Sequence, residues 1–103
     1  SSVYSNSNIS KIQKAVADYF DITVENLKSK KRTANINNAR QIAMYLCREI
    51  ANMSYPQIGA DFGGRDHSTV MHACRKIEKE VKEKNNTKLI VDSVKNIIID
   101  GKQ

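Results

Sequence analysis

The sequence predicts an all-α protein of about six helices. Apolar residues recur three and four positions apart along most of the chain, which is the spacing of one side of an α-helix. The 103 residues include one Pro and four Gly, and no segment shows the sustained apolar and polar alternation of a strand. A chain of this length suffices for one hydrophobic core.

The first half of the chain predicts three helices and a basic loop. The first helix runs from about residue 10 to residue 20, and its apolar side consists of Ile9, Ile12, Val16, Tyr19 and Phe20. Thr23 can cap a short second helix. A basic loop spans residues 28–37, and a third helix begins near Asn38. The third helix is expected at the centre of the core, because one stripe of it carries Ile42, Leu46, Ile50 and Met53.

The second half predicts three further helices. Ser54 and Gln57 can form a capping box at the start of a short fourth helix. The glycine pair at residues 63–64 ends that helix, since glycine readily adopts the positive φ angles of a tight corner. The fifth helix follows from about residue 66 to residue 84. After a break at residues 85–87, the sixth helix uses Leu89, Ile90, Val94, Ile97 and Ile98.

One domain is predicted over residues 9–103. Residues 1–8 are mostly Ser and Asn and lack the basic start and apolar stretch of a secretory signal, so we interpret them as a linker or an expression remnant. The longest apolar run, residues 42–47, is far shorter than the ~20 residues that span a bilayer. Cys47 and Cys74 lack the spacing of a zinc site or a redox pair. We expect two buried, reduced thiols in a cytoplasmic protein that does not require a membrane.

The charge distribution favours a polyanionic partner such as nucleic acid. Lys and Arg exceed Asp and Glu by 17 to 11, which gives a formal net charge of +6. Residues 28–48 contain six cations and no acid. An arm that carries residues 30–32 could enter a narrow minor groove, where negative potential is concentrated. Arg40 and Gln41, near the start of the third helix, could bind phosphates.

The fourth helix, the glycine corner and the fifth helix form a helix-turn-helix pattern, in which the second helix enters the major groove of DNA. The core-facing side of the fifth helix carries Val70, Cys74, Ile77 and Val81. The opposite side carries Ser68, His72, Arg75, Lys76 and Lys79. This opposite side has cations, hydroxyls and an imidazole but no acid, as expected of a surface that contacts DNA.

The start of the fifth helix carries candidate base readers. The Asp66 carboxylate can accept from the cytosine amino group, and the His67 imidazole can contact a thymine methyl group or donate to a base. The Ser68 hydroxyl can donate or accept. Simpler interpretations stay open: Asp66 could be only a helix cap, and His67 and His72 could be solvated or packing histidines. An ordinary solvated surface could equally account for Arg75, Lys76 and Lys79.

Residues 63–77, GGRDHSTVMHACRKI, resemble the signature of domain IV, the C-terminal DNA-binding domain of the bacterial chromosomal replication initiator family DnaA. The resemblance extends over about residues 9–98 and includes the segments 29–32, 40–46 and 55–59. It implies a Trp-repressor-like helix-turn-helix core that binds short asymmetric DnaA boxes at the replication origin. It also implies a monomer, with one domain per box, and regulatory proteins of replication as further possible partners.

The resemblance assigns base contacts to Arg32 in the minor groove and to Asp66, His67 and Ser68 in the major groove. The DNA backbone contacts that we expect are Lys30, Lys31, Arg40, Gln41, Arg65, Thr69, His72 and Lys76. Asn38-Ala39 stands where many family members carry Arg-Pro, so a cation and a rigid helix start are missing. Ser68 stands where Thr is frequent, which removes a methyl group that could contact thymine. We expect the same DNA target despite both departures.

The motif content argues against an enzyme. The family's ATP-binding module precedes this domain, whereas this chain has no Gly-x-x-x-x-Gly-Lys-Ser/Thr loop. We expect no cofactor in this fragment, and ATP binding only in the full-length protein. A metal site is not expected either, because His72 and Cys74 lie about 200° apart around one helix. Nonspecific nucleic-acid binding and a transcription-regulatory helix-turn-helix stay open as alternative functions.

Overall fold

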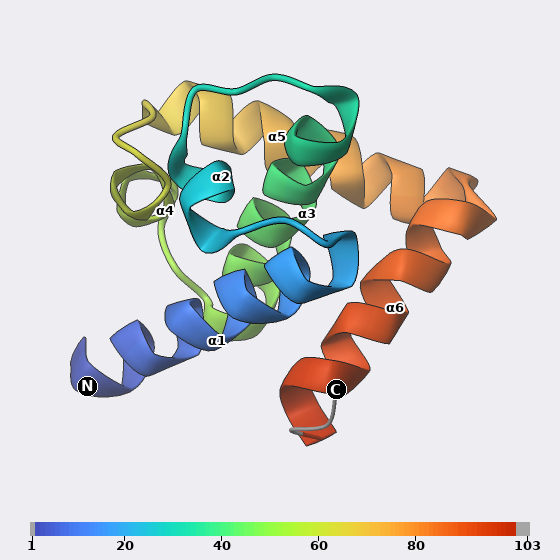
Figure 1. The fold of residues 1–103 in the computed structure, drawn as a ribbon, viewed down its shortest axis with the longest axis horizontal. Coiled ribbons are helices and arrows are strands. Elements are labelled where there is room, and N and C mark those ends of the chain that lie inside the picture. Colours follow the sequence, from blue (N-terminus) through green and yellow to red (C-terminus); the bar gives the residue numbers. More distant parts are fainter. Residues whose placement is uncertain (1, 101–103) are drawn as a thin grey trace.

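The computed structural model describes residues 2–100, with side chains from residue 8 onward. Its helices are α1 (Ser2–Phe20), α2 (Val24–Lys28), α3 (Ala34–Ala51), α4 (Tyr55–Asp61), α5 (His67–Glu83) and α6 (Asn85–Asp100). Figure 1 shows α3 at the centre of the molecule, with α1 and α2 in front of it and α5 behind. The described residues contain no strand, so the prediction of an all-α fold with about six helices is confirmed.

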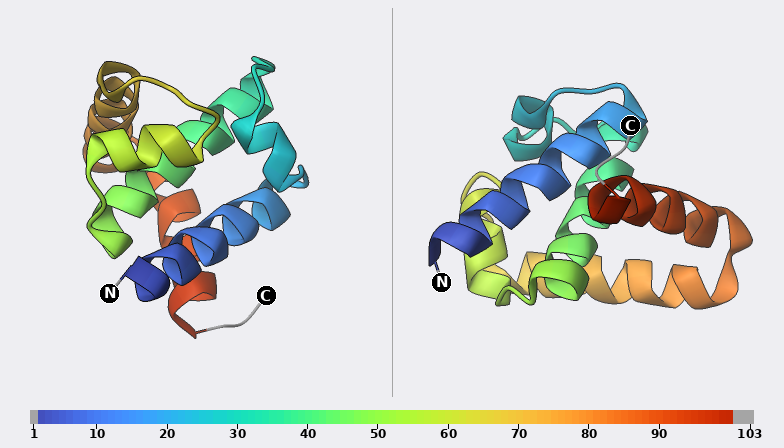
Figure 2. Two further views of the ribbon diagram at one scale, coloured as in Figure 1. Left: turned by 90° about the vertical axis from the view of Figure 1, so that its left-hand side faces the viewer. Right: turned by 90° about the horizontal axis from the view of Figure 1, so that it is seen from below.

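Helix α3 forms the centre of the core. Nine of its residues are buried, and Ile42 and Leu46 of the predicted stripe are fully buried. Helices α1 and α5 both pack against α3, and α6 packs against α5 and α1 (Figure 2). Cys47 and Cys74 are free and buried, as predicted, and burial raises the pKa of the Cys74 thiol to about 11.

Capping boxes precede the two short helices. The Thr23 hydroxyl accepts from the Asn26 N–H at 3.1 Å, and the Asn26 side chain accepts from the Thr23 N–H at 3.1 Å. Ser54 and Gln57 make the same two bonds before α4, at 3.3 and 3.1 Å. Since a helix start leaves N–H groups without intrahelical partners, these bonds stabilise α2 and α4. The predicted caps at Thr23 and Ser54 are confirmed.

Helix α3 begins earlier than the sequence predicts, at Ala34 rather than near Asn38. Thr33 is its cap, and the Thr33 hydroxyl accepts from the N–H three residues further on at 3.3 Å. Threonine is a favourable cap and residues 34–51 contain no Gly or Pro, so the helix begins directly after Thr33. The predicted loop of residues 28–37 is therefore too long. The nonhelical arm between α2 and α3 is residues 29–33.

Helix α1 also begins earlier than predicted, at Ser2 rather than near residue 10. Residues 2–9 contain no Gly or Pro that would end a helix. The interpretation of residues 1–8 as a linker or remnant stays a prediction. Tyr19 was predicted in the apolar side of this helix, but it is 44% exposed and packs edge-on against the Phe20 ring.

Helices α5 and α6 form a hairpin, with only Lys84 between them (Figure 2). The predicted break at residues 85–87 is therefore wrong, since these residues belong to α6. Leu89, predicted on the apolar side of α6, is 65% exposed. Helix α6 instead packs against α5 and α1 through a face that contains the buried residues Val91 and Val94.

The corner between α4 and α5 depends on Gly59. Its carbonyl accepts from the N–H groups of Phe62, Gly64 and Arg65 at 3.2, 3.0 and 2.9 Å. Gly63 and Gly64 have φ angles of 85° and 78°, as expected for a tight corner. A Cβ atom on Gly59 would overlap the carbonyl oxygen of Arg65, which is backbone and cannot rotate away. This close approach fixes where α5 begins relative to α4.

We predict that Gly59→Ala destabilises the fold. A Gly→Ala change within a helix ordinarily stabilises by about 0.5–1 kcal/mol. Here the added methyl group must displace the corner, which costs about 1–3 kcal/mol. Urea denaturation followed by circular dichroism measures the free energy of unfolding. Asn96→Ala, at an exposed position of α6, is the control and should leave that free energy nearly unchanged. A Gly59→Ala chain as stable as the unmodified chain would contradict the close approach.

Candidate nucleic-acid interface

The start of α5 carries the three candidate major-groove readers. Asp66 is the cap of α5, with φ −77° and ψ 159°, and its Oδ1 accepts from the Ser68 N–H at 3.2 Å. Asp66 and His67 are exposed, and Ser68 is half-buried. The interpretation of Asp66 as a helix cap is confirmed. The cap uses Oδ1, so Oδ2 is left as an acceptor for a ligand.

The two sides of α5 are arranged as the helical spacing predicts. Val70, Cys74 and Ile77 are buried, and Val81 is half-buried against the core. The exposed residues of the other side are His72, Arg75, Lys76 and Lys79. One expectation is wrong: this side is not free of acids, because Glu80 pairs with Lys76 across one turn at 3.5 Å. Glu80 offsets part of the positive charge of Lys76, whereas Arg75 and Lys79 form no ion pair with another described residue.

A cleft of about 580 Å³ lies among the arm, α3 and the start of α5. Its lining residues are Arg32, Asn37, Arg40, Gln41, Met44, Arg65, Thr69, His72, Ala73 and Lys76. Many of the predicted DNA contacts therefore line this one cleft. Asn37 and Met44 also line the cleft but were not predicted, although each lies four residues from a predicted contact on α3 and so on the same side of the helix. The other predicted contacts do not line the cleft: Lys30, Lys31, Asp66, His67 and Ser68.

A hydrogen bond between α5 and α3 orders one wall of the cleft. The Lys76 ammonium group on α5 donates to the Gln41 side-chain oxygen on α3 at 2.8 Å. Thr69 and His72 are exposed on the same helix as Lys76. Three polar groups of α5 thus lie on the side of the cleft that Lys76 shares with Gln41 of α3, where each can contact an anion.

Arg40 is only 3% exposed, although the sequence predicts a phosphate contact there. Its Nε donates to the Leu27 carbonyl at 2.8 Å, and its Nη2 donates to the carbonyls of Asn26 and Ser29, both at 2.9 Å. These acceptors are at the carboxyl end of α2, whose last carbonyls have no partner within the helix. Arg40 therefore has a structural role that sequence spacing did not indicate. Its Nη1 donates to no described residue and is the part left for a ligand.

Arg65, in the corner between α4 and α5, also binds one of the carbonyls that Arg40 binds, that of Ser29. Its Nη2 donates to the Ser29 carbonyl at 2.6 Å, and its Nη1 donates to the Phe62 carbonyl. The Ser29 oxygen thus accepts from two guanidinium groups, one from α3 and one from the corner. The role of Ser29 was not predictable from the sequence, because any residue type can supply a backbone acceptor. We call this contact of Ser29 with Arg40 and Arg65 the Ser29 junction.

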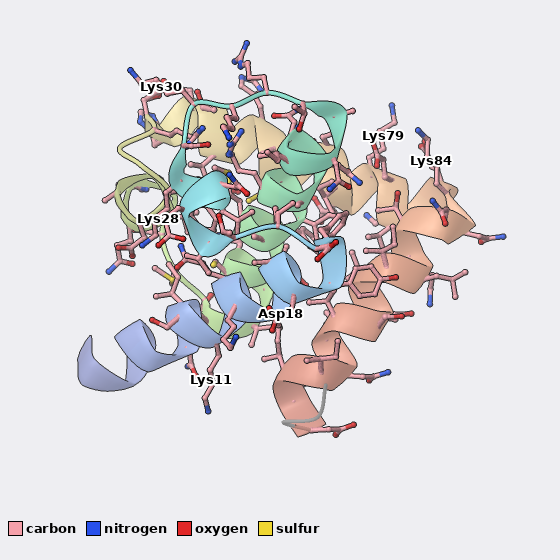
Figure 3. The ribbon with its side chains drawn as sticks, viewed as in Figure 1. Lys11, Asp18, Lys28, Lys30, Lys79 and Lys84 are labelled. Carbon is pink, nitrogen blue, oxygen red and sulfur yellow. The ribbon has the colours of Figure 1, made fainter. Side chains whose placement is uncertain are left out.

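Positive charge is concentrated at the cleft. Burial, and then the charges of Arg65 and Arg32, lower the pKa of Arg40. Burial, and then Arg32, lower the pKa of Arg65. No acidic residue is among those that line the cleft. Figure 3 shows Lys30, Lys79 and Lys84 projecting from one edge of the molecule and Lys11 from the opposite edge. The cleft and its surroundings are suited to an anion.

The described residues contain no group of three or more His, Cys, Asp or Glu side chains that could hold a metal ion. His72 is exposed whereas Cys74 is buried, so these two side chains face different surroundings. Within the same residues, no helix has the length and apolar character needed to cross a membrane.

Comparisons with known proteins point to one family. Residues 9–77 match the family model described as bacterial dnaA protein helix-turn-helix. The chromosomal replication initiator protein DnaA of Treponema denticola is 46% identical over 93 residues, which cover 90% of this chain and 20% of that protein. The protein of the same name from Lactobacillus delbrueckii subsp. bulgaricus is 50% identical over 90 residues, which cover 87% of this chain and 20% of the relative.

A solved structure described as a DNA replication initiation factor has a similar fold, with a TM-score of 0.83 and 36% sequence identity. The similarity covers 94% of this chain and 30% of that chain. This chain spans about a fifth of the length of the curated relatives, which have 20% of their residues in the match. The family model describes a helix-turn-helix and not a catalytic module. The chain therefore belongs to the bacterial DnaA family, as its C-terminal helix-turn-helix domain, domain IV.

Proposed function

We propose that this domain binds double-stranded DNA sequence-specifically at the DnaA boxes of a replication origin, as part of an initiator of chromosomal replication. The observation that carries the proposal is the cleft, which three arginines and no acidic residue line and which lies beside the exposed start of α5. Phosphates are attracted to such a surface, and the start of a helix can present side chains to base edges. The family supports replication initiation as the setting.

The start of α5 supplies the proposed major-groove reading. Asp66 and His67 are exposed there, and Asp66 keeps one carboxylate oxygen outside the cap. That oxygen can accept from a cytosine amino group, while the imidazole of His67 can donate to a base or contact a thymine methyl group. Ser68 adds a hydroxyl that can act either way.

The arm supplies the proposed minor-groove reading. Arg32 is exposed, lies between α2 and α3, and is one of the residues that line the cleft. An arginine inserted into a narrow minor groove meets concentrated negative potential without a need for base-specific bonds. Arg32 and the start of α5 would then contact adjacent grooves of one duplex.

The proposed backbone contacts surround these two readers. Gln41, Thr69, His72 and Lys76 line the cleft and offer donors to phosphate oxygens. Lys30 and Lys31 are exposed on the arm beside Arg32. For Arg40 and Arg65 we propose mainly a contribution of positive charge, because most of their hydrogen bonds are made inside the protein.

We further propose that this domain binds as a monomer, with one domain on each box. ATP binding and contacts with regulatory proteins are proposed for the full-length initiator rather than for this chain, which spans about a fifth of its relatives. Nonspecific nucleic-acid binding is the second candidate, since the same cations would attract any polyanion.

The experiment that separates the two functions compares a DnaA-box duplex with a scrambled duplex of equal composition. Fluorescence anisotropy gives the Kd of each duplex over several salt concentrations. Both affinities should fall with salt, and the box duplex should stay at least about tenfold tighter at every concentration. Equal affinities that fall together with salt would support nonspecific binding and contradict the proposal.

Asp66→Asn separates base reading from helix capping. Asn caps a helix about as well as Asp, so the free energy of unfolding should change by less than about 0.5 kcal/mol. The amide replaces the purely accepting carboxylate, so the box duplex should lose about 1–3 kcal/mol while the scrambled duplex changes little. Asp66→Ala, which removes both roles, is the comparison. If Asp66→Asn keeps the full preference for the box, Asp66 is only a cap.

Arg32→Ala tests the minor-groove contact. Two box duplexes are compared that differ only in the flanking sequence, one with a narrow A-tract groove and one with a wide G·C groove. The loss of affinity should be larger on the narrow groove, because the negative potential is stronger there. Lys82→Ala, exposed in the last turn of α5, is the control and should weaken both duplexes alike. If Arg32→Ala lowers the affinity for both duplexes equally, a minor-groove contact by the arm is contradicted.

A further inference from the structure

The arm begins at a backbone that is held from several directions. The Ser29 carbonyl accepts from Arg40 at 2.9 Å and from Arg65 at 2.6 Å. The Ser29 hydroxyl donates to the Asn26 carbonyl at 2.8 Å and accepts from the Lys31 N–H at 3.2 Å. Arg32 follows directly after these bonded residues, so its backbone starts from a defined place.

The same backbone also touches the corner that precedes α5. Gly63 approaches the Lys28 carbonyl so closely that a Cβ atom would overlap that oxygen. Arg65 belongs to this corner and immediately precedes Asp66, the cap of α5. The end of α2 and the start of α5 are therefore joined at two neighbouring carbonyls, those of Lys28 and Ser29.

We propose that Arg65 is a positioning residue that fixes the arm relative to the start of α5, so that Arg32 and the α5 readers meet adjacent grooves in one register. This inference rests on the proposed DNA-binding function and adds a role that a phosphate contact by Arg65 does not include. Arg65 acts through the Ser29 carbonyl, with Arg40 holding the same oxygen from α3.

The geometry requires a guanidinium rather than a positive charge alone. Arg65 uses two different nitrogen atoms to reach two carbonyls, those of Phe62 and Ser29. A lysine at this position keeps the charge but has one nitrogen atom and no planar arrangement of donors. Arg65→Lys therefore distinguishes a positioning role from a simple attraction to phosphate.

A double-mutant cycle between Arg65→Lys and Arg32→Ala measures this role on a DnaA-box duplex. If Arg65 positions Arg32, the Arg65→Lys change already removes the benefit of Arg32, and the two losses are less than additive. Additive losses would multiply the Kd increases of the two single variants. We expect the Kd of the double variant to be lower than that product by at least about threefold. Arg75→Lys, an equal change at an exposed residue of α5 that does not line the cleft, is the control and should be additive with Arg32→Ala.

A second measurement needs no DNA. Limited digestion with trypsin, followed by mass spectrometry, reports how often the backbone at residues 30–32 opens for cleavage. Arg65→Lys should raise the initial cleavage rate at these sites by about threefold or more, whereas Arg75→Lys should leave it unchanged. Arg65→Gln is the second variant, because it also lacks the planar set of donors and should raise the rate in the same way.

The outcomes distinguish the inference from the proposed function. If the unmodified domain does not prefer the box duplex, the proposed function fails, and the trypsin rates still test the junction. If it prefers the box but the cycle with Arg65→Lys is additive and cleavage is unchanged, Arg65 contributes only charge and the inference is overturned. Circular dichroism at the assay temperature establishes that each variant is folded before its Kd is compared.

Discussion

The carboxyl end of α2 is held by two arginine guanidiniums, and the positions of the arm, α3 and α5 depend on this contact. Arg40 binds three carbonyls there and Arg65 binds one of the three as well. Bonds from a charged donor are stronger than neutral ones, and a buried carbonyl that loses its donor costs about 1–3 kcal/mol. The junction therefore connects the end of α2, α3 and the corner before α5. The local sequence of each element specifies that element but not its contact with the other two.

Local patterns account for much of the fold. The caps at Thr23, Ser54 and Asp66 depend on side chains within three residues of the helix start, so the sequence alone predicts them. The buried side of α5 follows from helical periodicity. The start of α3 was misplaced because Thr33 and Asn38 are both reasonable starts, and the earlier cap forms. Leu89 was misplaced because which side of α6 is buried depends on α5 and α1.

Most residues of the candidate site could be predicted from the sequence, but their contacts with one another could not. Basic residues on α5, on α3 and in the arm could each be recognised, and several of them line one cleft. The structural role of Arg40, in addition to its positive charge, could not be predicted, because its acceptors are backbone carbonyls distant in sequence. Burial lowers the pKa of Arg40, and repulsion from the neighbouring charges of Arg65 and Arg32 lowers it further. An anion that binds only the folded domain relieves this repulsion and adds stability.

The central claim is that the Ser29 junction holds the arm and the start of α5 as one unit on DNA. The most direct measurement is a crystal structure of this domain bound to a DnaA-box duplex. We predict that Arg40 and Arg65 still donate to the Ser29 carbonyl, with Arg32 in the minor groove and the start of α5 in the adjacent major groove. A complex in which Arg65 has left Ser29 for a phosphate, with Arg32 still in the minor groove, would contradict the claim.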